Sequence, residues 1–176
     1  MKTSQVTPLQ ASRDAVDLEE WIFSLSDEDY QAASPQHRAA GVTWENGVRG
    51  TINVESIGGS LLVQHYREVA ADAHGFELLS EHSRVYLFHV VPVEAEVRWT
   101  MAVEPGTDGN ALLRCTVELR LSPLLRVLSA FIATPHFIRR HVSNESVGFA
   151  RDIDRKYGSH RDVGPHPRPS VEGVGP

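Results

Sequence analysis

The chain has 176 residues, of which 41% are hydrophobic and 23% charged, and its net charge is −6. This composition excludes a wholly disordered or fibrous protein, and the length suits one hydrophobic core. The sequence holds no Lys/Arg cluster and no apolar run near the roughly 20 residues of a membrane span, so we expect no nucleic-acid partner and no membrane segment. The start MKTSQVTPLQ lacks an apolar secretory region, and a lone Cys115 forms no internal disulfide, so we expect a cytoplasmic protein.

The two ends of the chain are predicted to lie outside the fold. Residues 1–13 lack hydrophobic periodicity, and residues 158–176 are rich in Gly and Pro with few large apolar groups. Such segments bury too little surface to offset the entropy lost on ordering. We therefore expect a flexible N-terminus, a single domain over 14–157 and a disordered tail.

Short helices are predicted over residues 14–41. Four apolar residues recur there at helical spacing: Leu18, Trp21, Ile22 and Leu25. Ser26, with Asp29 three positions later, is typical of a capped helix start. Ser34–Pro35 indicates a further helix start, and Gly41 is suited to end that helix.

An antiparallel sheet is predicted over residues 42–121, where polar and apolar residues alternate. Gly58–Gly59 separates two such runs and predicts a two-residue hairpin. That turn pairs three sets of residues: Ser56 with Leu61, Val54 with Val63, and Ile52 with His65. Further strands are expected at 74–80, 84–91, 94–103 and 113–121. One face of this sheet is expected to be wet and the other buried.

A long helical segment, broken at Pro135, is predicted over residues 123–157. Its apolar stripes need a surface to cover, and the buried face of the sheet offers one. The order of elements therefore predicts an α+β fold in which a curved antiparallel sheet wraps around a long C-terminal helix.

His141 and Glu145 form the first candidate site. Residues four apart lie one turn apart on the same helix face, so this imidazole and carboxylate can reach one cation. They border the apolar stripe of the same helix, which favours a position facing the core. The alternative is an exposed His–Glu pair with a small effect on helix stability.

The segment VQHYREV offers a second set of candidates, because strand neighbours point to opposite faces. Either His65 faces the interior and Glu68 faces solvent, or Gln64 and Tyr66 line a polar cavity with Glu68. The sequence leaves both open. Further polar candidates lie nearby: His37, Glu45, Asn53 and Glu55.

These segments resemble a known superfamily. INVESIGGSLLVQHYREV and HVSNESVGFARDI are similar to small bacterial helix-grip proteins of the START and polyketide-cyclase (SRPBCC) superfamily, in which a cavity lies between the sheet and the last helix. The spacing of His37, Glu68 and His141-xxx-Glu145 is also similar to that of zinc-dependent diacetylphloroglucinol and phloretin hydrolases. The resemblance implies that these four residues bind zinc and that Tyr30 polarises the substrate.

The function expected from this resemblance is a zinc-dependent hydrolase or lyase acting on a small aromatic or polyketide-like ketone. Tyr30 or His65 would then protonate the leaving group. A metal-free cyclase or aromatase, with His65, Tyr66 or His89 moving protons, is one alternative, and a non-catalytic carrier of an apolar molecule is another. Cys115 is interpreted as a core residue, and a homodimer is a common default.

Overall fold

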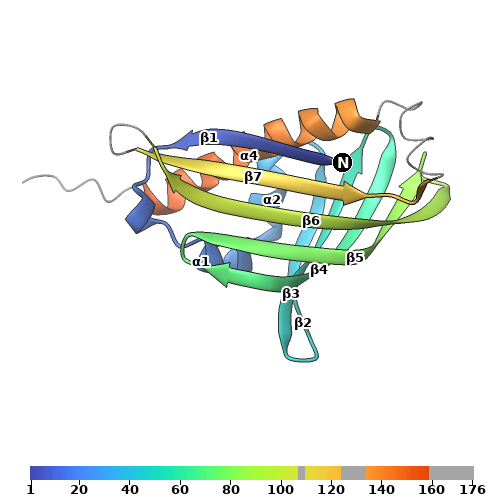
Figure 1. The fold of residues 1–176 in the computed structure, drawn as a ribbon, viewed down its shortest axis with the longest axis horizontal. Helices are drawn as coiled ribbons and strands as arrows, with labels where there is room; N and C mark the ends of the chain where they lie inside the picture. Colours follow the sequence, from blue (N-terminus) through green and yellow to red (C-terminus); the bar gives the residue numbers. More distant parts are fainter. Residues whose placement is uncertain (107–109, 124–133, 159–176) are drawn as a thin grey trace, which may run out of the picture.

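The computed structural model describes residues 1–106, 110–123 and 134–158. Its body is a seven-stranded antiparallel sheet in the order β1-β7-β6-β5-β4-β3-β2 (Figure 1). The strands are β1 (Lys2–Leu9), β2 (His37–Glu45), β3 (Val48–Ile57), β4 (Ser60–Asp72), β5 (Gly75–Leu87), β6 (Val91–Pro105) and β7 (Ala111–Arg120). The helices are the 3-10 helix η1 (Arg13–Ala15), α1 (Leu18–Ser24), α2 (Asp27–Ala33) and α4 (Thr134–Tyr157).

Two tight turns build the β2–β3–β4 part of the sheet. Gly58 and Gly59 both have positive φ, 57° and 80°, and the three residue pairs predicted around them are the pairs observed. Asn46 and Gly47, with φ of 52° and 79°, make a second such turn between β2 and β3. Both turns have the left-handed backbone that suits the twist of hairpin strands.

The β5 strand joins two segments that were predicted as separate strands. It runs without interruption to Leu87, and a register shift against β6 lies between Ser80 and Ser83. Both serines are buried, and the Ser83 hydroxyl donates to that of Ser80 at 2.8 Å. An irregularity of this kind interrupts side-chain alternation, which is why the sequence pattern suggests two strands.

The prediction that residues 1–13 lie outside the fold is wrong. Strand β1 pairs with β7 along its whole length, from Lys2 opposite Glu118 to Leu9 opposite Ala111. The Thr7 and Ser146 hydroxyls lie 2.7 Å apart, which also ties β1 to α4. Backbone pairing holds this mostly polar edge strand, and hydrophobic periodicity does not report it. Residues 159–176, most of the predicted tail, and 124–133, part of the predicted helical segment, lie outside the described residues.

The helical prediction for residues 14–41 is confirmed only in its first two thirds. The Ser26 hydroxyl accepts a hydrogen bond from the Asp29 amide at 3.0 Å and begins α2, as expected. Ser34–Pro35 does not begin a helix: it forms a turn, and strand β2 follows from His37. The prediction fails there because proline suits turns as well as first helical turns.

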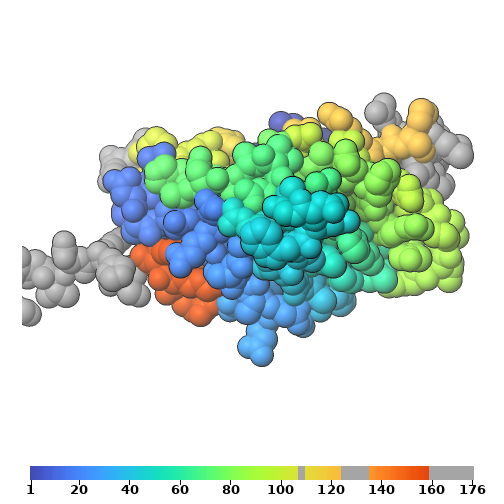
Figure 2. Space-filling view, turned by 90° about the horizontal axis from the view of Figure 1, so that it is seen from below, coloured from blue at the N-terminus to red at the C-terminus, as the bar shows by residue number. Residues whose placement is uncertain are grey.

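Helix α4 lies along the curved inner face of the sheet. It contacts β1 and β7 near one edge and β3 toward the other, and it packs beside α2. Figure 2 shows the last turns of α4 next to the early helices, although they are far apart in sequence. The approach to α2 is very close, because a Cβ on Gly148 would lie 1.9 Å from the Ala33 carbonyl oxygen. The α+β prediction of a sheet wrapped around a C-terminal helix is therefore confirmed.

Aromatic side chains fill the core between α4, α1 and the sheet. Phe149 contacts Trp21 edge-on and packs on Trp99, with ring centroids 5.2 and 5.6 Å apart. Phe76 meets Trp99 edge-on at 5.1 Å. Within the described ranges, no helix is both long and apolar enough to cross a membrane.

Candidate metal centre and pocket

Four buried side chains converge beneath α4: His37, Glu55, His141 and Glu145. One ligand atom from each lies within 4.8 Å of every other. His141 Nε2 is 3.1 Å from Glu145 Oε2 and 3.5 Å from Glu55 Oε2, and His37 Nε2 is 3.4 Å from Glu145 Oε2. Ligands of a tetrahedral zinc ion at about 2.0–2.2 Å lie roughly 3.3–3.6 Å from one another. The three measured separations are close to that spacing.

The β2–β3 ladder brings His37 and Glu55 together. They are opposite each other in the register, and a bulge follows between His37 and Ala39. Strand β3 alternates, so that Thr51, Asn53, Glu55 and Ile57 all face the interior. The turn at Ser34 sets where β2 begins, because the His37 amide bonds the Ser34 carbonyl at 3.1 Å.

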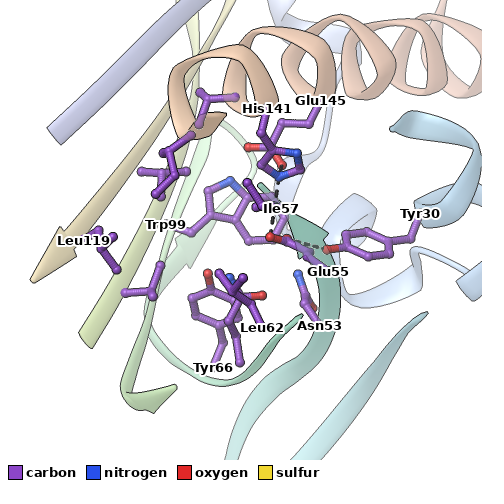
Figure 3. Close-up of a pocket in the computed structure, with 15 residues that line it drawn as sticks. Tyr30, Asn53, Glu55, Ile57, Leu62, Tyr66, Trp99, Leu119, His141 and Glu145 are labelled. Carbon is purple, nitrogen blue, oxygen red and sulfur yellow. Dashed lines mark hydrogen bonds and ion pairs between the residues drawn. The ribbon is translucent and has the colours of Figure 1, made fainter. Parts of the chain in front are cut away.

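Helix α4 supplies the other two ligands from one face. His141 and Glu145 lie one turn apart, and Val142, Phe149 and Ile153 continue the buried stripe. Figure 3 shows both side chains pointing from α4 toward Glu55, while Tyr30 reaches Glu55 from the side. The prediction that His141 and Glu145 face the core is therefore confirmed.

Tyr30 orients two members of the cluster at once. Its ring lies parallel to that of His37, with an interplanar angle of 3° and centroids 3.8 Å apart. Its backbone carbonyl accepts a hydrogen bond from His37 Nδ1 at 2.6 Å, and its hydroxyl donates to Glu55 Oε1 at 2.6 Å. Because a carbonyl only accepts, Nδ1 carries the proton and Nε2 is free to act as a ligand.

Without a metal, the cluster is a network of charges. Burial alone would lower the pKa of His141, but Glu145 and Glu55 outweigh it and raise that pKa to about 10. Burial alone would raise the pKa of Glu145, and the nearby His141 instead lowers it to about 2. The pKa of Glu55 is lowered in the same way. His141 is therefore positively charged in the metal-free protein and shares its proton with two carboxylates.

Cys115 lies against the cluster without joining it. Its thiol is fully buried on β7 and donates weakly to Glu145 Oε1, with sulfur and oxygen 3.7 Å apart. Burial, followed by the charge of Glu145, raises the pKa of this thiol well above its usual value. A thiol that keeps its proton packs as a small apolar group, which agrees with its interpretation as a core residue.

A pocket opens beside Glu55, His141 and Glu145 on the inner face of the sheet. Its cavity volume is about 30 Å³, room for about two water molecules, within about 470 Å³ of space that includes the open mouth, so a larger ligand would need side chains of the wall to move. Most of its wall is apolar, and its apolar residues are Ile57, Leu62, Val97, Trp99, Val117, Leu119, Ile138 and Val142. Tyr30 and three further polar side chains complete it: Asn53, Gln64 and Tyr66. A molecule in this pocket would touch the cluster directly.

Glu68, expected as a zinc ligand, does not join the cluster. It lies six residues along β4 from Leu62, the partner of Glu55, and a strand rises about 3.3 Å per residue, which places it roughly 20 Å away. Its carboxylate pairs with Arg49 at 2.8 Å near α1. Glu55 takes the fourth place. The sequence offered a signal for it, because the predicted hairpin register sets Glu55 beside Leu62 and on the same face as Asn53.

His65, expected as a proton donor, does not face the pocket. Gln64 and Tyr66 are buried and line it, whereas His65 between them is exposed on the other face of β4. His89 is also exposed, in the turn between β5 and β6. Of the three groups suggested for a metal-free cyclase, only Tyr66 lines the pocket. Burial, assisted by Glu55 and Glu145, raises the pKa of Tyr66 well above its usual value.

The fold of this chain is shared by solved structures. A protein of Thermus thermophilus matches with a TM-score of 0.63 and 12% identity, over 89% of this chain and 99% of that one. A START superfamily protein from Mycobacterium smegmatis matches with a TM-score of 0.51 and 13% identity, over 88% and 98%. The chain has the helix-grip fold.

A third helix-grip structure is the di-domain ARO/CYC StfQ of the steffimycin biosynthetic pathway. The TM-score is 0.53 at 10% identity, over 89% of this chain and 52% of StfQ. No family model and no curated protein matches the chain in sequence. At such identities the likeness of this helix-grip protein to its structural neighbours establishes the fold alone.

Proposed function

We propose that this helix-grip protein is a metal-dependent hydrolase or lyase acting on a ketone of a small aromatic or polyketide-like molecule. The observation that carries the proposal is the orientation of His37. Its protonated Nδ1 is bound to a carbonyl, and its free Nε2 points to Glu145, as in metal-binding imidazoles. With the other three side chains it makes a set of two nitrogen and two carboxylate ligands, which suits zinc.

The charge of the cluster supports a divalent cation. Two carboxylates are buried there, and among the described residues neither is paired with a Lys or Arg side chain. In the metal-free protein the charge of His141 offsets only one of the two, and a buried carboxylate that is not offset is costly. One divalent ion and two neutral imidazoles would leave the site with no net charge.

The residues of the chain divide the remaining work. Four protein ligands fill a tetrahedral zinc site, so one of the two carboxylates would have to give up its place to a water or to the substrate. A bound zinc ion would then polarise a carbonyl oxygen or lower the pKa of the bound water. Trp99 and the apolar wall would hold an aromatic ring, while Tyr30 keeps His37 and Glu55 in place. Tyr66 keeps its proton and lines the same pocket, so its hydroxyl replaces His65 as the group that donates a proton to the substrate.

The second candidate is a metal-free cyclase, and the observation that favours it is the charge network itself. His141, held positive between Glu145 and Glu55, shares its Nε2 proton with both carboxylates without an ion, although its Nδ1 is buried without a partner. StfQ, whose fold this chain shares, carries the designation ARO/CYC. A carrier of apolar molecules would use the same apolar wall without turnover.

Metal content and turnover of the purified full chain separate these candidates. We expect about one equivalent of zinc by elemental analysis. We also expect turnover of an aryl ketone that a chelator abolishes and zinc restores. His141→Ala should lose both metal and turnover, whereas His136→Ala, an exposed histidine on the same helix, should keep both. Metal below about a tenth of an equivalent, with turnover unaffected by chelator and by zinc, would establish the metal-free alternative.

A further inference from the structure

Uncharged polar side chains continue the inner face of the sheet next to the cluster. Asn53 lies two residues before Glu55 on β3, and Gln64 lies directly opposite Asn53 on β4. Each of the two is only 3% exposed, and both line the pocket. Figure 3 shows Asn53 beside Glu55 at the pocket wall. These two amides therefore adjoin the proposed metal site within one cavity.

Gln64 is not satisfied by the protein. Its Oε1 is buried and has no hydrogen-bond partner, and Thr51 Oγ1, on the next inward position of β3, is in the same state. Buried polar atoms are hydrogen-bonded in the large majority of cases, because an unpaired one keeps its full desolvation cost. An apolar side chain would suit this wall better if nothing polar ever bound there. An unpaired amide at the wall of a pocket indicates a polar group on the ligand.

The chemistry of the wall selects the kind of group. A side-chain amide has both a hydrogen-bond donor and an acceptor, and a ligand hydroxyl can accept from the one or donate to the other. A charged group is disfavoured, since the pocket wall contains two carboxylates and no Lys or Arg among the described residues. The wall thus suits a neutral hydroxyl.

The spacing sets where that hydroxyl lies. Residues two apart on a strand are roughly 6.6 Å apart, so Asn53 and its partner Gln64 lie about that far from Glu55 along the sheet. One aromatic ring spans this distance between a carbonyl oxygen and a hydroxyl on the far side of the ring. A hydroxyl next to the carbonyl would be too close to the cluster to reach Gln64.

We infer that Gln64, supported by Asn53, is a specificity-determining residue that binds a ring hydroxyl of the ligand opposite its ketone. This inference rests on the proposed function for the position of the ketone. It assigns the pocket two anchors, the metal centre at one end and the amide pair at the other, with the apolar wall between them.

The probes are acetophenone and its 4-hydroxy and 2-hydroxy derivatives, with dissociation constants measured by calorimetry on the zinc-loaded full chain. We expect the 4-hydroxy compound to bind about two- to tenfold more tightly than acetophenone, the range of one neutral hydrogen bond, and the 2-hydroxy compound to gain less. In Gln64→Met, which keeps side-chain length, that advantage should disappear. His65→Met, at the exposed position next to Gln64 on the other face of the strand, should retain it.

Metal content distinguishes the two levels of failure. Gln64→Met should keep its zinc. If the wild type binds no metal, the proposed function is overturned, but the ratio of the dissociation constants of acetophenone and 4-hydroxyacetophenone still tests whether Gln64 binds the hydroxyl. The inference is overturned if the wild type does not prefer the 4-hydroxy compound, if it binds none of the three, or if Gln64→Met keeps the preference. The comparison of 4-hydroxy with 2-hydroxy in the wild type needs no variant and stands even if Gln64→Met does not fold.

Discussion

The two ends of the β3–β4 ladder each hold a glutamate, and the partners of the two carboxylates differ. At the α1 end, Glu68 accepts two hydrogen bonds from Arg49, which also pairs with Glu19 and stacks over Phe23. At the pocket end, Glu55 is more deeply buried and has no Arg or Lys partner among the described residues. A carboxylate that has its own fixed cation is structural. One that is buried among histidines is suited to hold an ion from outside.

The largest expected effect separates Glu55 from Glu68. In Glu55→Gln, a ligand loses its charge, and zinc affinity should fall by more than the roughly 10–100-fold that partners of ligands typically cost. Glu68→Gln should leave zinc affinity unchanged, because its carboxylate is bound to Arg49 away from the cluster. Competition of each variant with a chromophoric chelator measures both. Equal losses, or a loss only in Glu68→Gln, would reverse the assignment.

A smaller effect is expected from Tyr30→Phe, which removes the hydroxyl bonded to Glu55 but keeps the ring stacked on His37. We expect zinc affinity to fall about 10–100-fold, as for other groups that orient a ligand. Tyr157→Phe, which removes a hydroxyl near Asp17, is the matched control. If Tyr30→Phe binds zinc as the wild type does but turns over slowly, Tyr30 acts on the substrate and not on the ligands.

The pocket end also depends on the contact between α4 and α2. In Gly148→Ala, the added methyl would overlap the Ala33 carbonyl, so the helices must separate, at a cost of about 1–3 kcal/mol in the free energy of unfolding. Gly41→Ala is the control, because nothing lies within 4 Å of its added Cβ. Urea denaturation measures both, and equal stability of the two variants would contradict the tight contact.

The last prediction concerns the pH dependence of the metal-free protein. The pKa of His141 rises from 6.5 to about 10 on folding, so its stabilisation is complete below pH 6.5 and is lost as pH rises toward 10. The pKa of Glu145 falls from 4.5 to about 2, so its contribution is present above pH 4.5 and is lost as pH falls toward 2. Stability should therefore be greatest between pH 4.5 and 6.5.

Urea denaturation of the chelator-treated protein across this range tests the pH prediction. The decline above pH 6.5 should be absent in His141→Gln, whereas Glu68→Gln should retain it because His141 and its two carboxylate partners are unchanged. A flat profile in the wild type between pH 6.5 and 10 would show that His141 carries no charge in the folded metal-free protein.

The sequence was sufficient for features that depend on local patterns. The Gly58–Gly59 hairpin, the Ser26 cap and the inward His141–Glu145 pair all follow from spacing within a few residues. The errors arise where distant pairing decides. Strand β1 is held by β7 more than a hundred residues later, and strand β2, predicted as a helix start at Ser34–Pro35, is held by its pairing with β3.

The choice between Glu55 and Glu68 shows the same limit. The number of residues between His37 and Glu68 resembles the ligand spacing of the zinc-dependent hydrolases, which favours Glu68. In the structure, the sheet register instead places Glu55 opposite His37. A count of residues between two candidates does not give the strand face of either one, whereas a hairpin turn gives both register and face. The register of the Gly58–Gly59 hairpin sets Glu55 opposite Leu62, and the alternation of β3 puts it on the inner face with Asn53.

X-ray absorption at the zinc edge of the zinc-loaded full chain tests the metal centre most directly. We predict a first shell of nitrogen and oxygen only, at about 2.0–2.2 Å, with the outer-shell signature of two imidazoles and a clear change in Glu55→Gln. A sulfur shell at about 2.3 Å, which would implicate Cys115, or a spectrum unaltered by Glu55→Gln would contradict the assignment of His37, Glu55, His141 and Glu145.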